Sequence, residues 1–252
     1  MDQPLTGQTI LVAGSSGELG AGIVQHLARE GARVIIHYDH DPESAQTLLQ
    51  HAEGNGYLIQ ADLLSQEGPF ELWSKAVQAA GRIDALVNNA ATRTEVSIEA
   101  PALDWKAVWQ KEFQMNFFAA ADLCKEALKH FRQNQGGRIV NMCSRSGQRG
   151  YVAEAMAYGA SKAALINLTK SIARSFGPDG VVAVAIAPGW VKDEMAEQYI
   201  ATYGKEAAVA DIPIGEIVSP DEIAELVAFV LRNSQRSLNG ATLDVNGGSY
   251  IR

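Results

Sequence analysis

The chain has 252 residues, of which 47% are hydrophobic and 20% are charged, and its formal net charge is −8. This length and ordinary globular composition suffice for one large domain or two small ones, with a full hydrophobic core. The acidic balance and the lack of any run of Lys and Arg argue against a nucleic-acid or anionic-membrane partner.

The N-terminal stretch MDQPLTGQTI lacks the basic and apolar regions of a signal peptide, and no apolar run reaches the ~20 residues that span a bilayer. Cys124 and Cys143 have neither the spacing of a metal site nor that of a disulfide framework. The five histidines form no metal-ligand pattern beyond a loose His37/His40 pair. We therefore expect a cytoplasmic protein with reduced thiols, no membrane segment and no metal site.

Short apolar, β-branched runs alternate with helical patterns along the whole chain. The predicted strands are 9–13, 33–38, 57–60, 85–88, 138–143, 181–186 and 241–245. The predicted helices lie near 19–30, 43–52, 66–80, 104–131, 158–176 and 221–232. The last helix opens with a capping box in which Ser219 is the N-cap, Pro220 the first residue and Glu222 the third.

The predicted strands are apolar at consecutive positions, as in strands that are covered on both faces. Strand and helix alternate over the full length, which is typical of the α/β class. We predict a single Rossmann-type doubly wound domain over residues 1–252, with a seven-stranded parallel sheet and helices on both faces. Ligands of such folds bind beyond the carboxyl ends of the strands.

The first strand runs into AGSSGELG at 13–20, where Gly14, Gly17 and Gly20 recur at every third position. Glycine permits a tight turn and lets the backbone approach a pyrophosphate, and the following helix N-terminus offers free N–H groups to the anion. Glycines also serve plain structural turns, but the position between first strand and first helix favours a dinucleotide cradle. We include Ser16 and Leu19 of this loop among the predicted cofactor contacts.

Asp39 follows the second predicted strand, about 20 residues beyond the glycines. An acid at this place accepts a hydrogen bond from a ribose 2′-hydroxyl and repels a 2′-phosphate. No Arg or Lys stands in the glycine loop or between 34 and 74. We therefore favour NAD(H), with NADP(H) as the alternative and a solvated loop acid as the non-functional reading. Asp62, just after the third strand, is either an adenine contact or a helix cap.

Several short motifs occur in order along the chain and together resemble the short-chain dehydrogenase/reductase family. They are AGSSGELG, NNA (88–90), Asn116, Ser144, YGASK (158–162), PGWV (188–191) and VNGG (245–248). The resemblance covers essentially all of the chain, and the combination is far more specific than a tyrosine and lysine at this spacing alone. The ending LDVNGG is similar to that of bacterial 3-oxoacyl-(acyl carrier protein) reductases.

The resemblance implies a role for each matching residue. The implied catalytic residues are Tyr158 as general acid and base, Lys162 as its partner, Ser144 as the group that holds the substrate oxygen, and Asn116 in a proton relay. The implied cofactor contacts are Asp62, Leu63, Asn89, Ala90, Pro188, Gly189 and Val191, together with Tyr158 and Lys162. The family also implies a homotetramer, or a homodimer, built on helices 104–131 and 158–176.

Some positions depart from the family pattern. Ala13 and Glu18 replace the usual Thr and Gly of the first turn, and Glu18 is expected to point outward. Asp193 replaces a Thr that usually meets the carboxamide, so this contact is not carried over. Asp179 stands near the place where carrier-protein reductases tend to have an Arg, which puts an acyl-carrier substrate in doubt.

Tyr158 and Lys162 stand one helical turn apart, so both side chains leave the same face. We expect Lys162 and an oxidised nicotinamide to lower the pKa of the Tyr158 phenol. The favoured function is an NAD(P)-dependent oxidoreductase acting on a carbonyl or a secondary alcohol of a small molecule, with a 3-oxoacyl thioester as the best single guess. Epimerisation or dehydration on the same fold and a non-catalytic nucleotide-binding scaffold or sensor are the alternatives.

The stretch 190–218 carries Trp190, Met195, Tyr199 and Tyr203, and is interpreted as a flap over the substrate or, alternatively, as a surface helix pair. Trp190 and Tyr151 are candidate walls of the substrate pocket. Arg145 and Arg149 flank Ser144 and either pair with an acidic substrate group or are solvated loop charges.

Overall fold

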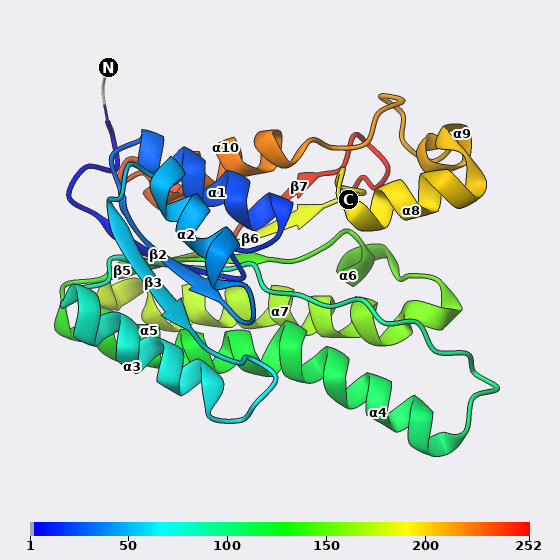
Figure 1. The fold of residues 1–252 in the computed structure, drawn as a ribbon, viewed down its shortest axis with the longest axis horizontal. Helices are drawn as coiled ribbons and strands as arrows, with labels where there is room; N and C mark the ends of the chain where they lie inside the picture. The colour runs from blue at the N-terminus through cyan, green and yellow to red at the C-terminus, as the bar shows by residue number, and fades with distance from the viewer. Residues whose placement is uncertain (1–2) are drawn as a thin grey trace.

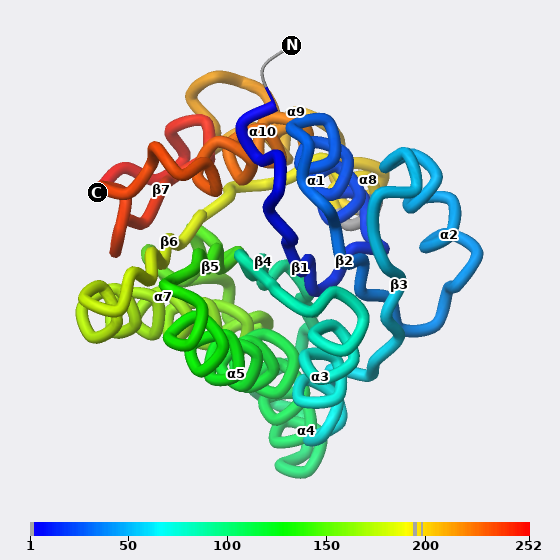
Figure 2. The backbone as a smooth tube through the Cα atoms, turned by 90° about the vertical axis from the view of Figure 1, so that its left-hand side faces the viewer, coloured from blue at the N-terminus to red at the C-terminus, as the bar shows by residue number. Residues whose placement is uncertain are grey.

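The computed structural model describes residues 3–252, except for the side chains of 194, 195 and 198. Within this range a parallel sheet has the strand order β3-β2-β1-β4-β5-β6-β7. Figure 2 shows these strands from β7 on the left to β3 on the right, between two layers of helices. The strands are β1 (Thr9–Ala13), β2 (Arg33–Tyr38), β3 (Gly56–Gln60), β4 (Ala85–Asn88), β5 (Gly137–Met142), β6 (Val181–Pro188) and β7 (Thr242–Val245).

Helices cover both faces of the sheet (Figure 1). One layer consists of α1 (Glu18–Arg29), α2 (Pro42–His51) and α10 (Pro220–Leu231). The other layer consists of α3 (Gly68–Ala80), α5 (Ala119–Gln133) and α7 (Met156–Phe176), with α4 (Ala102–Phe113) extending beyond it. The short helices α6 (Ser146–Arg149), α8 (Glu194–Tyr203) and α9 (Lys205–Val209) lie at the carboxyl end of the strands. The predicted fold class is confirmed.

The alternation of side chains along a strand explains why the strand sequences are apolar throughout. In β1, Ile10 and Val12 pack into the core under α1, α2 and α10, whereas Leu11 and Ala13 pack into the core under α3 and α5. Each residue of this strand is therefore buried, whichever face it points to. The same argument holds for β4 and most of β6.

The predicted strands agree with the observed ones to within a residue, except that β6 extends further than expected, to Pro188. The capping box of α10 is present: the Ser219 hydroxyl accepts from Asp221, and the Glu222 carboxylate accepts the Ser219 backbone N–H at 2.9 Å. The helix predicted over 104–131 is interrupted by one π-helical segment at Gln114–Phe118. Such a wide turn inserts one extra residue per turn and rotates the helix surface that follows it.

Strand order determines which loops meet. Because β1 pairs with both β2 and β4, the chain turns in opposite directions at the carboxyl ends of β1 and β4. In this register Ala13 lies beside Asn88, and Asn88 lies beside Asn141 of β5. The loops after β1, β4 and β5 therefore come together at one edge of the sheet, as in other doubly wound folds. Within the described residues, no helix is both long and apolar enough to cross a membrane.

Candidate active site

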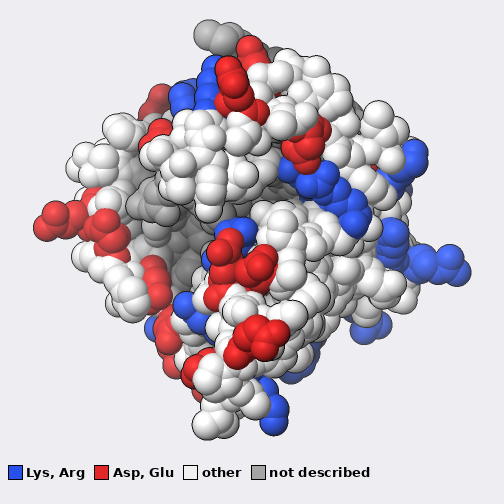
Figure 3. All heavy atoms as spheres, turned by 90° about the vertical axis from the view of Figure 1, so that its right-hand side faces the viewer, with Lys and Arg blue, Asp and Glu red and all other residues white. Residues whose placement is uncertain are grey.

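A cavity of about 940 Å³ opens at the carboxyl edge of the sheet. Figure 3 faces this end of the molecule and shows a hollow with charged side chains at its rim. The cavity is lined by the glycine loop with the ends of β2 and β3, by the loops after β4 and β5, by α7, and by the start of the segment after β6. The predicted site residues that line it are Gly14, Ser16, Gly17, Leu19, Gly20, Asp39, Leu63, Asn89, Ala90, Ser144, Tyr158, Lys162, Pro188, Gly189 and Val191.

The three glycines of the first loop have different physical roles. Gly14 has φ +82°, and a Cβ on it would lie 2.5 Å from the backbone N and Cα of Ala90. A Cβ on Gly20 would collide with the Gly14 carbonyl oxygen. Gly17, in contrast, has φ −79° and open space where its Cβ would be. Gly14 and Gly20 are therefore required by packing, whereas Gly17 leaves room for a ligand.

Helix α1 begins behind this loop without a side-chain cap, because Gly17 is its N-cap. The N–H groups of its first turn have no partner within the helix and are free to bind an anion. Glu18, expected to point outward, is exposed and borders the cavity. The open space at Gly17 and these N–H groups fit the diphosphate of a dinucleotide.

His37 of β2 holds the glycine loop in place and was missed by the sequence analysis. The Gly14 N–H donates to His37 Nδ1 at 2.9 Å, which leaves Nε2 to donate to the Ala61 carbonyl oxygen at 3.0 Å. Burial lowers the pKa of His37, so the ring stays neutral in this tautomer. Its position as a polar residue inside the apolar run RVIIHY is the sequence feature that could have indicated a structural role for His37.

The acids at the ends of β2 and β3 differ in their positions. Asp39 borders the cavity, and its Oδ2 lies 3.1 Å from Nε2 of the exposed His40. Asp62 is not among the residues that line the cavity, and its carboxylate accepts the Leu64 N–H at 2.8 Å. Its neighbour Leu63 lines the cavity. The helix-cap alternative for Asp62 is wrong, because α3 begins at Gly68 with Glu67 as its N-cap, and the Asp62 carboxylate instead stabilises the turn after β3.

The loops after β4 and β6 close the floor of the cavity. The Asn89 amide donates to the Gly14 carbonyl oxygen at 2.7 Å and so joins the first two loops. A Cβ on Gly189 would lie 2.9 Å from Asn246, which explains the glycine after Pro188. Asp193, which departs from the family pattern, caps α8 by accepting the Ala196 N–H at 2.8 Å.

Ser144, Tyr158 and Lys162 come together as predicted. Ser144 follows β5, and its hydroxyl is hydrogen-bonded to Tyr158 and accepts the Ser146 N–H at 3.1 Å. Lys162 is 2% exposed, and its Nζ donates to the Met142 carbonyl oxygen at 2.8 Å. The same Nζ lies 5.8 Å from the centre of the Tyr158 ring.

The expected lowering of the Tyr158 pKa by Lys162 is not found in the protein by itself. Although Tyr158 keeps some exposed surface, burial around its hydroxyl raises the pKa to about 12, and the hydrogen bond with Ser144 offsets this only in part. Lys162 is not among the groups that move this pKa, since its ammonium is turned to the Met142 carbonyl. Burial also lowers the pKa of Lys162. The phenol is therefore protonated at neutral pH.

Asn116 lies in the π-helical segment, and its side chain is 1% exposed. Its amide oxygen accepts the Thr92 N–H at 2.8 Å, and its nitrogen donates to the Thr92 carbonyl at 2.9 Å and to Glu112 at 3.0 Å. The side chain thus ties the π-helical segment to the loop after β4. It is not among the groups that line the cavity.

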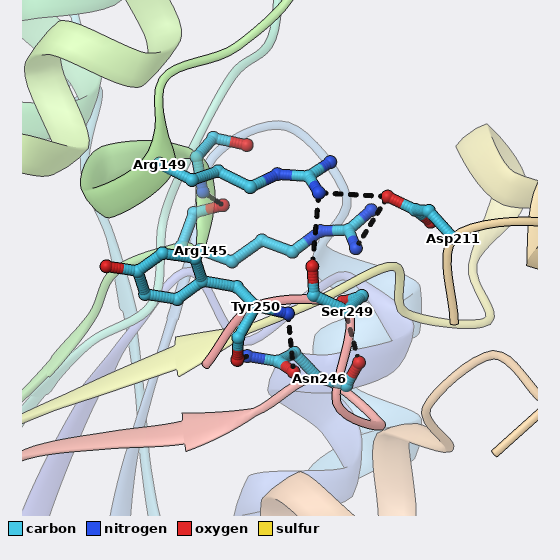
Figure 4. A network of polar contacts seen from close by, with 8 residues as sticks. Arg145, Arg149, Asp211, Asn246, Ser249 and Tyr250 are labelled. Carbon is cyan, nitrogen blue, oxygen red and sulfur yellow. Dashed lines mark hydrogen bonds and ion pairs between the residues drawn. The ribbon is translucent and has the colours of Figure 1, made fainter. Parts of the chain in front are cut away.

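Arg145 and Arg149 both bind Asp211, which lies in the stretch 190–218 (Figure 4). The distances to Asp211 Oδ2 are 3.2 Å from Arg145 and 2.9 Å from Arg149. Arg149 also donates to the Ser249 carbonyl oxygen at 3.2 Å. Arg145 is buried and Arg149 is exposed, and both pair with Asp211 of the same chain. The two arginines connect the loop after Ser144 to the candidate flap and, through Arg149, to the C-terminal residues.

Aromatic side chains form the outer wall. Tyr151 and Trp190 line the cavity as expected, and the ring centres of Tyr151 and Tyr158 are 6.0 Å apart. Trp190 packs on Tyr199 of α8 at 5.3 Å, and Tyr199 packs on Tyr203 at 4.7 Å. The side chain of Met195 lies outside the described residues.

The family of the chain follows from comparisons with known proteins. A family model described as enoyl-(acyl carrier protein) reductase matches residues 12–250. The chain is 34% identical to 3-oxoacyl-(acyl-carrier-protein) reductase FabG of Rickettsia conorii over 248 residues, 98% of each protein. The chain belongs to the short-chain dehydrogenase/reductase family.

Solved structures of this family have the same fold. A Serratia marcescens short-chain dehydrogenase/reductase, solved as a double mutant, has a TM-score of 0.90 and 31% identity, covering 98% of this chain and all of that one. The Pseudomonas aeruginosa RhlG/NADP active-site complex has a TM-score of 0.89 and 29% identity over the full length of both. As a short-chain dehydrogenase/reductase, the protein is an NAD(P)-dependent oxidoreductase that acts on a carbonyl or an alcohol.

Proposed function

We propose that this enzyme reduces the keto group of a 3-oxoacyl thioester, with NADH as the favoured cofactor. The observation that carries the proposal is the meeting of Ser144, Tyr158 and Lys162 in the cavity that the glycine loop also lines. The similarity to 3-oxoacyl-(acyl-carrier-protein) reductases supports the substrate class. Asp179 stands near the place where carrier-protein reductases tend to have an Arg for docking of the carrier. This acid argues that the physiological substrate is not attached to an acyl carrier protein.

The dinucleotide would lie along the glycine loop, with Gly17 and the first turn of α1 at its diphosphate. Asn89 and Ala90 would support one ribose, and Pro188, Gly189 and Val191 the nicotinamide end. When bound, the cofactor supplies the hydride for the carbonyl carbon.

The residues of the chain handle the carbonyl oxygen and its proton. The Ser144 hydroxyl orients the oxygen by a hydrogen bond. Tyr158 donates its proton as negative charge develops there, and its raised pKa keeps that proton in place at neutral pH. Lys162 would hold a ribose hydroxyl with the N–H groups that do not bind Met142. Asn116 supports this geometry through its contacts with Thr92.

Asp39 is the basis of the proposed preference for NADH. Its carboxylate borders the cavity at the end of β2 and would accept a hydrogen bond from a ribose 2′-hydroxyl. A 2′-phosphate there would meet this negative charge, and the nearby His40 is the sole basic side chain paired with it in the described structure. NADPH use would require that pair to rearrange.

We further propose that the segment 190–218 acts as a flap over the substrate. It is joined to the body of the protein through the Asp211 ion pairs, and the packing of Trp190 on Tyr199 is a contact within the segment. We also propose a homo-oligomer whose interface lies around Phe118, because half of the surface of this apolar residue is exposed. On the second helix of the expected interface, α7, the apolar residues Leu165 and Ile166 are instead buried within the chain. Light scattering in solution tests this assembly.

Absorbance assays with NADH or NADPH and a panel of ketones and 3-oxoacyl thioesters test the proposal. We expect oxidation of NADH with a thioester and a loss of about 10²- to 10⁴-fold in kcat for Tyr158→Phe. Tyr57→Phe, in β3 at the far edge of the sheet, is the matched control. Cofactor binding without any oxidation would instead favour the scaffold alternative, and a strong preference for NADPH would refute the role of Asp39.

A further inference from the structure

A buried carboxylate holds the loop after β4 next to the active site. Glu112 of α4 is 0% exposed. Its Oε1 accepts the Thr92 hydroxyl at 3.0 Å and the Thr94 N–H at 2.9 Å, and its Oε2 accepts the Asn116 amide at 3.0 Å. Removing a carboxylate from water is costly, and three donors offset that cost. Glu112 therefore holds Thr92 and Thr94, the residues on either side of Arg93, in place.

The Arg93 side chain is 16% exposed and borders the cavity. Its Nε donates to the Tyr151 hydroxyl at 3.2 Å, and its guanidinium carbon lies 5.2 Å from the centre of the Tyr151 ring. Its Nη2 pairs with Glu95 at 2.7 Å. Among the described residues, none accepts a hydrogen bond from Nη1. A guanidinium fixed in this way is well suited to bind an oxygen acceptor through its remaining N–H groups.

Arg93 is also close to the reacting centre. The Tyr151 ring that it contacts packs against Tyr158 at 6.0 Å. The charge of Arg93 acts on the Tyr158 hydroxyl and opposes the effect of burial there. A substrate whose carbonyl is held by Tyr158 and Ser144 would thus bring the atoms a few bonds away toward Arg93.

We propose that Arg93 is a substrate-specificity residue that binds a second acceptor oxygen, two carbons from the carbonyl that is reduced. This oxygen is the carboxylate of a 3-oxo acid or the carbonyl of its thioester. The inference rests on the proposed function and assigns the residue that recognises the second carbonyl or carboxylate oxygen of its substrate. A simple ketone lacks this oxygen and leaves the Arg93 donors without a substrate partner, which lowers its rate through weaker transition-state binding.

The test compares wild type and Arg93→Gln on 3-oxobutanoate, its N-acetylcysteamine thioester and 2-butanone. A hydrogen bond from a charged donor corresponds to about ten- to hundredfold. We expect the ratio of kcat/KM between a dicarbonyl substrate and 2-butanone to fall by that factor in Arg93→Gln. A fall for the free acid alone identifies the carboxylate as the ligand, and a fall for the thioester identifies its carbonyl. Arg132→Gln, which removes an exposed arginine paired with Asp179, should keep the wild-type ratio.

An unchanged ratio in Arg93→Gln, with an unchanged melting temperature, would overturn the inference. If the wild type oxidises no cofactor with any of the three compounds, the proposed function fails. The role of Arg93 is then tested by the binding of 3-oxobutanoate. Calorimetry with cofactor-loaded protein then compares 3-oxobutanoate binding to both variants. Binding that depends on Arg93 supports the inference, whereas equal binding, or none to wild type, refutes it.

Discussion

Gly14 and Gly17 stand in the same loop, yet the structure predicts opposite effects of the same substitution. A Cβ at Gly14 would lie 2.5 Å from backbone atoms of Ala90, and the residue has φ +82°. A Cβ at Gly17 meets nothing within 4 Å, and its φ of −79° suits any residue. The pair Gly14→Ala and Gly17→Ala therefore separates packing from cofactor binding.

The expected costs follow from these contacts. A left-handed backbone costs about 1–2 kcal/mol for a residue with a Cβ, and a forced contact in a packed region costs about 1–3 kcal/mol. Gly14→Ala should thus lower the free energy of unfolding by about 2–5 kcal/mol, a large part of the ~5–15 kcal/mol typical of a domain. Gly17→Ala should change it by about 1 kcal/mol or less, the usual range for an N-cap.

Affinity for the cofactor should instead be the quantity that Gly17→Ala changes. The methyl group added by Gly17→Ala would occupy the space in which the diphosphate is proposed to lie. We therefore expect this variant to bind NADH at least about tenfold more weakly, which corresponds to ~1.4 kcal/mol. Urea unfolding measures the first quantity, and calorimetric titration with NADH measures the second. Equal stability of the two variants would refute the argument from the Ala90 contact. Wild-type affinity in Gly17→Ala would show that the diphosphate lies elsewhere.

Three further predictions concern groups outside the glycine pair. Burial raises the pKa of both Cys124 and Cys143 to about 12, so neither thiol should react with a disulfide reagent at about pH 8 until the protein unfolds; rapid labelling of the native protein would contradict this. Burial lowers the pKa of His37, so the unfolded chain takes up the proton first, and stability should be lost as the pH falls below ~6.5. Urea unfolding between about pH 5 and 8 should show a flatter dependence for His37→Gln, and an identical dependence would refute the assignment. Asp211→Asn removes the charge that Arg145 and Arg149 share, so proteolysis within 190–218 should become several-fold faster while the midpoint of global unfolding changes little; a wild-type cleavage rate would refute the flap contact.

Local patterns predicted the fold class and much of the site. The strands could be placed because each is apolar at consecutive positions, and the α10 start because the capping box lies within four adjacent residues. Ser144, Tyr158 and Lys162 could be named from motif spacing, and the structure brings them together. The sign of the Tyr158 pKa shift was not predictable, since it depends on how many atoms surround the hydroxyl and on which way Lys162 turns.

Features that depend on neighbouring residues are therefore readable from the chain alone: the alternation of strands and helices, the glycine turn, and the tyrosine and lysine on one helical face. Contacts between distant segments exist only in the folded molecule. His37 reaches Gly14 because β2 pairs with β1, and Glu112 of α4 reaches Thr92 and Thr94, 20 and 18 residues away in the chain. Such polar contacts leave no periodic signal in a sequence, because their energy arises from burial and geometry that appear once the chain has folded.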